Sequence, residues 1–399
     1  MLKAFKAFLC VLLTAVFLLC GCSTNESSEQ ETTASPTTEP TTAVPTAIAT
    51  NDSADAYKTQ NYDFVAIKQK SDEIMSAFDS YVAEKKFKGV IYMKLGNDFE
   101  YISSSGAADS ISHTDNSINT RFYAGSLTKQ VTAAAVLLLV EDNKLSLDDT
   151  LDKFFPDYKY GAEITVKNLL DMTSGIKNYI VHSDISEALT YLDIELSDKV
   201  SKDNSAKENK SAILKWILNQ EPQFEAGSTF QFSDSNYFLL GEIIAKTSEM
   251  SYEDFVKERL LKPLGMNSSG FEADKGLATG YDGNSESEKL TYSGVGYSAS
   301  GFISSISDTV KWIDGIFSND ILSEESVELM QAEGDYEYSC GVYVNGDRLS
   351  SYGKCSAYSS ILNYSTDKKK IYISYSNYNF ANPSNIYALF KTYISRFSA

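Results

Sequence analysis

Residues 124–143 read AGSLTKQVTAAAVLLLVEDN, with Ser126 and Lys129 directly before a long apolar run. The run predicts a buried helix that ends near Asn143. Because residues three apart lie on one face of a helix, the Ser126 hydroxyl and the Lys129 amine are expected to lie side by side. A neighbouring base makes a serine hydroxyl a good nucleophile, and a lysine can be that base when burial lowers its pKa. On these four residues alone, an N-cap serine beside a surface lysine is the commoner explanation.

The segments around this helix predict a mixed α/β (α+β) fold. Residues 63–87 have apolar side chains at helical spacing, and residues 88–108 read as two short strands joined in a hairpin. Residues 160–290 are mainly helical by pattern, with a polar insertion around 182–210, and the chain beyond Tyr336 turns to strands that end in a final helix. This order indicates one antiparallel sheet built from the N- and C-terminal segments and flanked by helices, with an inserted, mainly helical subdomain.

The N-terminal segment predicts export and lipid anchoring. A short basic region, an apolar run and Leu-Cys-Gly-Cys make residues 1–21 read as a secretory signal. Leu-Cys-Gly-Cys at residues 19–22 resembles the bacterial lipoprotein signal, which implies that Cys22 becomes the lipidated first residue of the mature chain. The alternative is plain secretion, with Cys22 as a free thiol. Residues 22–57 are rich in Ser, Thr and Pro, and we expect a disordered tether before a folded domain of residues 58–399. The expected location is the extracytoplasmic face of the cell membrane.

The composition narrows the classes of ligand. The chain has 35 Lys and Arg against 54 Asp and Glu, a formal net charge of −19, which argues against nucleic-acid binding. Its two His and five Cys are not arranged at metal-ligand spacing, so we expect no metal site and no cofactor. His113 and His182 have no flanking pattern that supports a Ser-His-Asp triad. Residues 296–300 nearly match Gly-x-Ser-x-Gly, but Ser300 replaces the last glycine. We expect a monomer.

Several consecutive blocks resemble the serine β-lactamase and penicillin-binding protein superfamily, whose signature includes Ser-x-x-Lys. The blocks are TRFYAGSLTKQVTAAAVLLLVEDNKLSLDDTLDKFFPDY from Thr120, ITVKNLLDMTSGIKNY from Ile164, FEAGSTFQFSDSNYFLLGEII from Phe224 and LKPLGMNSSGF from Leu261. The branch that they resemble most is the group of class C β-lactamases, D-alanyl-D-alanine carboxypeptidases and esterases. The resemblance implies an acyl-serine mechanism in which Ser126 is the nucleophile and Lys129 handles its proton.

The superfamily's second motif is Tyr-x-Asn, in a frame that reads here FQFSDSNYFLLG from Phe230. The resemblance places Phe232 at the tyrosine position and Asp234 at the asparagine position. Phe232 lacks the phenol that relays protons to the leaving group, and the Asp234 carboxylate favours a charged Lys129 amine. Ser233 offers a hydroxyl that could replace the phenol if the local backbone shifts.

The third motif is normally His or Lys, then Thr or Ser, then Gly, and the resemblance implies it at Lys354, Cys355 and Ser356. In the superfamily its positive side chain and backbone donors hold the substrate's carboxylate or carbonyl; an exposed strand lysine is the alternative explanation for Lys354. Ser356 in place of glycine would crowd a bound substrate. Cys340 and Cys355 lie at nearly facing positions of a predicted hairpin, so a disulfide between them is a hypothesis, with two separate thiols as the alternative.

Together these features predict a surface-anchored serine hydrolase that acts through an acyl-serine intermediate on peptidoglycan peptide or on small ester or amide substrates. The backbone N–H groups of Ser126 and of the strand near Ser356 are expected to stabilise the oxyanion. The alternative, favoured by Phe232, Cys355 and Ser356, is a catalytically impaired member that binds cell-wall peptide or has a regulatory role. The intact Ser126 and Lys129 pair favours residual acyl-enzyme chemistry.

Overall fold

The computed structural model describes residues 70–395, apart from residues 98, 183–189, 193, 198, 202, 274–275, 283–284, 287–293, 320 and 379–382. The predicted signal segment, the predicted lipidation site at Cys22 and the predicted tether lie outside these residues, as does part of the polar insertion around 182–210. No helix in the described part of the chain is both long and apolar enough to span a bilayer.

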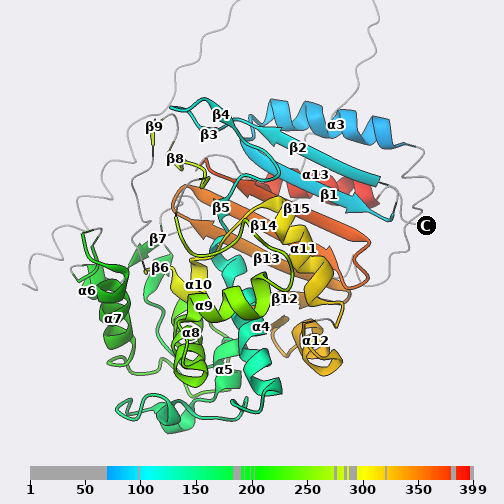
Figure 1. Ribbon diagram of the computed structural model, residues 1–399. Coiled ribbons are helices and arrows are strands. Elements are labelled where there is room, and N and C mark those ends of the chain that lie inside the picture. Colours follow the sequence, from blue (N-terminus) through cyan, green and yellow to red (C-terminus); the bar gives the residue numbers. More distant parts are fainter. Residues whose placement is uncertain are drawn as a thin grey trace, which may run out of the picture. The chain divides into compact units, whose positions relative to one another are not determined.

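A seven-stranded antiparallel sheet in the order β11-β12-β13-β14-β15-β1-β2 organises the fold (Figure 1). In chain order the strands are β1 (Gly89–Leu95), β2 (Phe99–Ser105), β11 (Tyr338–Ser339), β12 (Val342–Asn345), β13 (Arg348–Cys355), β14 (Tyr358–Ser365) and β15 (Lys370–Ser376). The N-terminal hairpin joins the C-terminal strands through β1, where Val90 pairs with Tyr375 of β15 and with Ser104 of β2. This pairing confirms the predicted sheet built from both ends of the folded domain.

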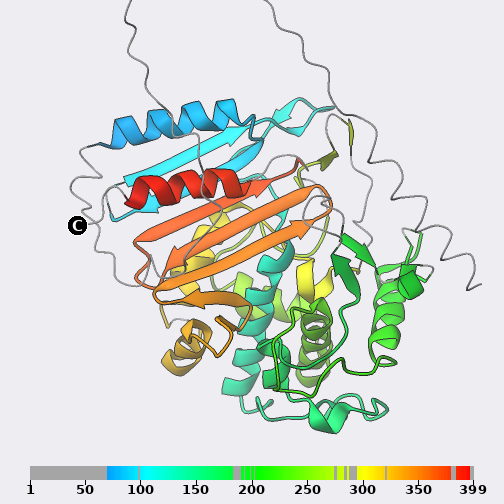
Figure 2. The ribbon, with the colours of Figure 1, turned by 180° about the vertical axis from the view of Figure 1, so that it is seen from behind.

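Two helices from opposite ends of the folded domain cover one face of the sheet. They are α3 (Ser71–Glu84) and α13 (Pro383–Ser395), and Figure 2 shows α13 in front of the strands with α3 beside it. The buried residues of α3 recur every four positions, so that one stripe of the helix faces the strands. This stripe packs with α13 and with strand side chains in one apolar cluster that includes Ile74, Phe78, Val82, Ile361, Tyr372, Ile386 and Phe390.

The opposite face carries the inserted segment, which is mainly helical as predicted. Its helices are α4 (Thr128–Glu141), α5 (Val166–Leu170), α6 (Ile194–Ser197), α7 (Ala206–Ile217), α8 (Asp234–Ser248), α9 (Tyr252–Val256), α10 (Tyr297–Ser300), α11 (Ile306–Ile316) and α12 (Glu324–Gln331). Four short strand pairs lie outside the main sheet among the described residues: β3 (Ala107–Asp109) with β4 (Thr114–Asp115), β5 (Phe122–Tyr123) with β10 (Ile303–Ser304), β6 (Ile180–His182) with β7 (Thr190–Leu192), and β8 (Tyr281–Asp282) with β9 (Ser285–Glu286).

Helix α4 is the central helix of this half, because it is buried around its whole circumference. Every residue from Thr128 to Leu139 is buried. Its polar side chains therefore need partners inside the protein. Thr132 donates to the Ser298 carbonyl at 2.7 Å, and Gln130 donates to Ser351 Oγ on β13 at 2.9 Å. These contacts hold the start of α4 between α10 and the sheet.

Two glycines bring the turn before α4 into direct contact with β13. This turn is the 3-10 helix η2 (Gly125–Leu127). A Cβ on Gly353 would lie 2.1 Å from the Ala124 carbonyl oxygen, and a Cβ on Gly125 would lie 2.6 Å from the Lys354 backbone nitrogen. Gly125 also has a φ of 56°, a left-handed conformation that strains other residues. Side chains at either position would force β13 away from η2.

Gly353→Ala is therefore expected to lower the free energy of unfolding by about 1–3 kcal/mol, the usual cost of extra atoms in a packed interior. Gly270→Ala is the matched control, because a Cβ on Gly270 meets nothing within 4 Å. Urea denaturation followed by circular dichroism measures both variants. Equal stability of the two variants would contradict the close contact between β13 and η2.

Candidate active site

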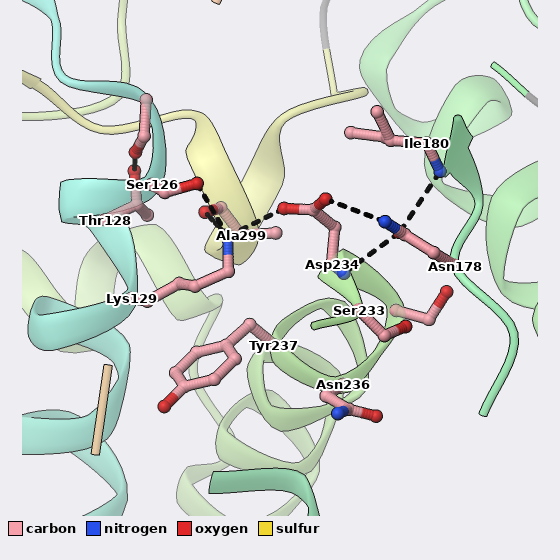
Figure 3. Close-up of polar contacts among 12 residues, drawn as sticks. Ser126, Thr128, Lys129, Asn178, Ile180, Ser233, Asp234, Asn236, Tyr237 and Ala299 are labelled. Carbon is pink, nitrogen blue, oxygen red and sulfur yellow. Dashed lines mark hydrogen bonds and ion pairs between the residues drawn. The ribbon is translucent and has the colours of Figure 1, made fainter. Parts of the chain in front are cut away.

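Ser126 and Lys129 lie together where η2 runs into α4 (Figure 3). The Lys129 amine donates a hydrogen bond to Ser126 Oγ at 3.0 Å. Ser126 is in the 3-10 turn, and α4 itself begins two residues later at Thr128. The N–H groups in the first turn of a helix have no partner within that helix. The turn therefore presents both the hydroxyl and the backbone N–H of Ser126 at one place.

The Lys129 amine contacts three acceptors on three different segments. Besides Ser126, it donates to Asp234 Oδ1 at 2.6 Å and to the Ala299 carbonyl oxygen at 2.9 Å. The Lys129 and Asp234 side chains are only 1% and 2% exposed. Burial lowers the pKa of Lys129, and the Asp234 carboxylate opposes that shift.

The three acceptors match the three N–H groups of a charged Lys129, and the same arrangement also suits an uncharged lysine that faces a serine hydroxyl. An uncharged amine has two N–H groups and one lone pair, whereas the ammonium form has three N–H groups and no lone pair. In the uncharged form the two N–H groups match Asp234 and Ala299, and the lone pair is left to accept the Ser126 proton. The site can therefore hold Lys129 in either protonation state without moving it.

The Asn178 side chain holds Asp234 in place through hydrogen bonds to both its backbone and its carboxylate. Its side-chain N–H donates to Asp234 Oδ2 at 3.3 Å, and its side-chain oxygen accepts the backbone N–H of Asp234 at 2.9 Å. The same oxygen accepts the backbone N–H of Ile180 at 3.2 Å. Asp234 is the first residue of α8, where the helix dipole also favours a negative charge. The sequence analysis did not identify Asn178, although it lies within the block from Ile164.

Phe232 lies over the Lys129 amine, at the position where the resemblance implies a tyrosine. The Lys129 Nζ is 4.8 Å from the centre of the Phe232 ring, a distance at which the ring attracts a cation. The ring also packs edge-on against Tyr338 of β11, with 6.5 Å between ring centres. Phe232 therefore stabilises a charged Lys129 but cannot carry a proton.

Ser233 does not replace the missing phenol. Its side chain is 1% exposed, and its hydroxyl has no hydrogen-bond partner in the part of the chain that the structure describes. Figure 3 shows Ser233 on the side of Asp234 away from Ser126 and Lys129. The reason is the start of α8: Ser233 is still extended, with a φ of −146°, and the helix begins only at Asp234, whose carboxylate reaches Lys129. The suggested rescue by Ser233 is therefore corrected.

The Lys354 side chain points away from the site, contrary to the implied third motif. Gly353 faces the Ala124 backbone on the inner side of β13. Successive residues of a strand point to opposite faces, so Tyr352 and Lys354 lie on the outer side, where both are exposed. The expectation that the Lys354 amine holds a substrate carboxylate beside Ser126 is therefore corrected.

The backbone N–H of Lys354, in contrast, faces η2, the turn that carries Ser126. A two-residue turn that starts at Ser356 joins β13 to β14, so Cys355 and Tyr358 form the hydrogen-bonded pair that closes the hairpin. Hydrogen-bonded and non-bonded pairs alternate in an antiparallel ladder, so the N–H of Lys354 points away from β14. It points toward η2, since its nitrogen lies 2.6 Å from where a Cβ of Gly125 would be. Ser356 itself lies in the turn and is buried.

Cys340 and Cys355 are separate thiols in place of the suggested disulfide. Cys340 lies in the turn between β11 and β12, whereas Cys355 pairs with Tyr358 at the far end of β13. β12 pairs only with the first residues of β13, up to Ser350, so the two cysteines do not face each other. Burial raises the pKa of each thiol to about 12, and the Asp234 carboxylate adds to the rise at Cys355. Cys355 lies two positions after Gly353 in β13, and therefore on the same inner face of the strand.

The other catalytic candidates that the sequence offered, a serine in the near match to Gly-x-Ser-x-Gly and two histidines, do not form a second site among the described residues. Ser298, in the near match at residues 296–300, is buried and donates to the Tyr237 carbonyl at 2.9 Å. The following residue, Ala299, supplies the carbonyl that holds Lys129, a role that no sequence pattern marks. His113 is exposed in a loop, and the side chain of His182 lies outside the described residues. Within the described ranges, no group of His, Cys, Asp and Glu could hold a metal ion.

Comparison with solved structures shows the same fold. FmtA from Staphylococcus aureus superposes with a TM-score of 0.68 at 20% identity, and the match covers 86% of this chain and 90% of FmtA. An octameric penicillin-binding protein homologue from Pyrococcus abyssi superposes with a TM-score of 0.66 at 26% identity, and this match covers 82% of this chain and 78% of the homologue.

Comparison of sequences places the chain in a family. It is 27% identical over 323 residues to a putative penicillin-binding protein, PbpX, of Bacillus subtilis, a match that covers 77% of each chain. It is 32% identical over 158 residues to the protein flp of Staphylococcus aureus, which covers 38% of this chain and 28% of flp. Residues 75–386, most of the chain, match the family described as Beta-lactamase. The chain therefore belongs to the Beta-lactamase family, which includes the penicillin-binding proteins that it resembles.

Proposed function

We propose that this chain is a serine hydrolase that forms an acyl-enzyme at Ser126 and acts on peptidoglycan peptide or on small esters or amides. The observation that carries the proposal is the 3.0 Å contact between Ser126 Oγ and the Lys129 amine beside a buried carboxylate. Family membership and the similarity to a putative penicillin-binding protein support it. We also propose that Cys22 anchors the chain to the extracytoplasmic face of the membrane, on the sequence of residues 1–22 alone.

In the proposed cycle, uncharged Lys129 takes the Ser126 proton as Oγ attacks the substrate carbonyl carbon. The backbone N–H groups of Ser126 and Lys354 donate hydrogen bonds to the oxyanion that forms. Lys129 then gives its proton to the leaving group, and the acyl group remains on Ser126. A water molecule loses a proton to Lys129 and attacks the acyl carbon; the bond from this carbon to Ser126 Oγ breaks, and Lys129 returns the proton to Oγ. Asp234 and Ala299 hold the amine through its two N–H groups in both halves of the cycle.

Two features of the site slow this cycle. Asp234 opposes the fall in the pKa of Lys129 and so reduces the uncharged fraction. Phe232 carries no proton, so Lys129 must make every proton transfer alone. A positioned acid or base typically contributes about 10²–10⁴-fold to a rate, and its loss is expected to slow deacylation in particular. Efficient turnover of β-lactams is therefore the least favoured activity.

The second candidate is a protein that keeps this fold, binds cell-wall peptide and does not turn it over. The contact between Phe232 and Lys129 favours it, because an aromatic ring stabilises the charged amine. The two candidates differ in one property, which is whether Ser126 can be acylated.

Labelling with a fluorescent fluorophosphonate and a fluorescent penicillin tests the acyl-serine proposal. We expect the fluorophosphonate to label wild-type protein at Ser126, located by peptide mass spectrometry, and Ser126→Ala to lose the label. His113→Ala is the control, because this exposed histidine lies outside the site. If neither probe labels the wild type, the binding protein is the better account.

Phe232→Tyr tests whether the missing phenol limits turnover. A hydroxyl on this ring would lie near Lys129, and we expect ester hydrolysis to rise by roughly 10-fold or more. Phe232→Leu is the control, since it removes the ring without adding a proton carrier. Steady-state hydrolysis of a chromogenic ester measures both. An unchanged rate in Phe232→Tyr would show that proton delivery to the leaving group is not limiting.

A further inference from the structure

Asp234 is the negative charge that acts on the groups around the nucleophile. Burial raises the pKa of the Cys355 thiol and holds the pKa values of the Tyr179 and Tyr338 phenols well above their usual range, and the Asp234 carboxylate adds to each of these shifts. These groups come from three different parts of the chain, so the field of the carboxylate covers the site from several sides. Lys129 neutralises this charge while its amine is protonated. In the reacting form, in which Lys129 is uncharged, a second carboxylate brought to Ser126 would be repelled by Asp234, and burial weakens the screening.

The cation that the third motif implies lies on the other side of β13. The contact between Gly353 and Ala124 fixes the face of this strand, and Lys354 follows Gly353 on the outer face. The residue that lies two positions before Gly353 on the inner face is Ser351. Its hydroxyl accepts from Gln130 at 2.9 Å and donates to the Gly341 carbonyl at 3.1 Å, so it carries no charge to the site.

Three described lysines, on α5, on α7 and in the segment before β6, have partners of their own. They are Lys167, which pairs with Asp171, Lys210, which lies 3.3 Å from Glu253, and Lys177, whose amine is 5.1 Å from the centre of the Trp216 ring. Lys129 itself is paired with Asp234. Proteins bind a carboxylate well through an arginine guanidinium or a lysine ammonium. These lysines already interact with other side chains, so they are not positioned to bind a substrate carboxylate.

An aromatic cluster makes up another side of the site. Phe232 lies over Lys129 and packs on Tyr338, and Phe230 packs on both Tyr338 and Tyr336, with 5.6 Å and 5.9 Å between ring centres. Tyr336 is 41% exposed, so the cluster reaches from the Lys129 amine to the surface. Such a surface favours uncharged groups, because a charge against it loses water without gaining a partner.

From these contacts we infer that the site takes esters, thioesters or amides whose leaving group carries no carboxylate, and discriminates against leaving groups that carry one. This inference rests on the proposed acyl-serine function and narrows its substrate class. The chemistry is otherwise unchanged: Ser126 Oγ bonds to the acyl carbon, the leaving group departs with the proton from Lys129, and water completes hydrolysis.

A matched pair of thioesters tests the inference on the full chain. Both have N-benzoylglycine as the acyl part; the leaving thiol is mercaptoacetate in one and the methyl ester of mercaptoacetate in the other. Thiol release and the mass of the acylated protein are the readouts. We expect the methyl ester to react with a kcat/KM at least about tenfold above that of the carboxylate form.

Two variants identify the cause of the preference through the ratio of the two rates, which cancels changes in the shared chemistry. Lys354→Gln should leave the ratio within about twofold, because the amine points away from Ser126. Asp234→Asn should shift the ratio toward the carboxylate form by about tenfold, because the repelling charge is gone.

The outcomes separate this inference from the function on which it rests. A preference for the carboxylate form that disappears in Lys354→Gln would overturn the inference while leaving the acyl-serine function intact, and so would equal rates for the two thioesters. If neither thioester acylates Ser126 and the fluorophosphonate also fails to label it, the results contradict both the proposed function and the inference that rests on it. Acylation of Ser126 by the methyl ester alone supports both.

Discussion

An amine cut off from water must find its acceptors inside the protein, and Lys129 finds them on three separate segments. Ser126 comes from the turn before α4, Asp234 from the start of α8, and Ala299 from α10. Removing one partner of a buried ion pair commonly costs about 3–5 kcal/mol, which is a large part of the stability of a typical domain. The packing of η2, α8 and α10 around the start of α4 and the assembly of the site therefore depend on the same buried amine.

The burial of Lys129 and its contacts also determine which protonation state of the amine is favoured. Burial lowers the pKa of Lys129 and makes the amine a possible base, while Asp234 and the Phe232 ring both favour its charged form. A family member with a phenol at position 232 would share the proton transfers between two groups. In the proposed cycle this chain leaves them to Lys129, which lowers the expected rate of turnover but keeps the proposed nucleophile, the proposed base and the two N–H groups proposed to bind the oxyanion.

The sequence predicted those parts of the molecule that local patterns determine. The N-terminal hairpin, the C-terminal strands, the buried helix after Ser126 and the adjacency of Ser126 and Lys129 follow from spacing and apolar periodicity. Tertiary contacts decided the rest. Asn178 and the Ala299 carbonyl reach the site from segments with no motif of their own. Lys354 was given the wrong role because a shift of one residue along a strand reverses the face on which a side chain lies, and only the contact between Gly353 and Ala124 shows which face is inner.

The most direct test of this account is the pH dependence of the rate at which the fluorophosphonate acylates Ser126, in wild-type protein and in Asp234→Asn. Lys129 must be uncharged to accept the serine proton, so the rate should rise with pH and level off once the amine has lost its proton. Asp234 raises the pKa of Lys129, so its replacement should move the rising limb to lower pH. A rate that rises over the same pH range in both proteins, or that does not depend on pH, would contradict the central claim that Lys129, held by Asp234, is the base for Ser126.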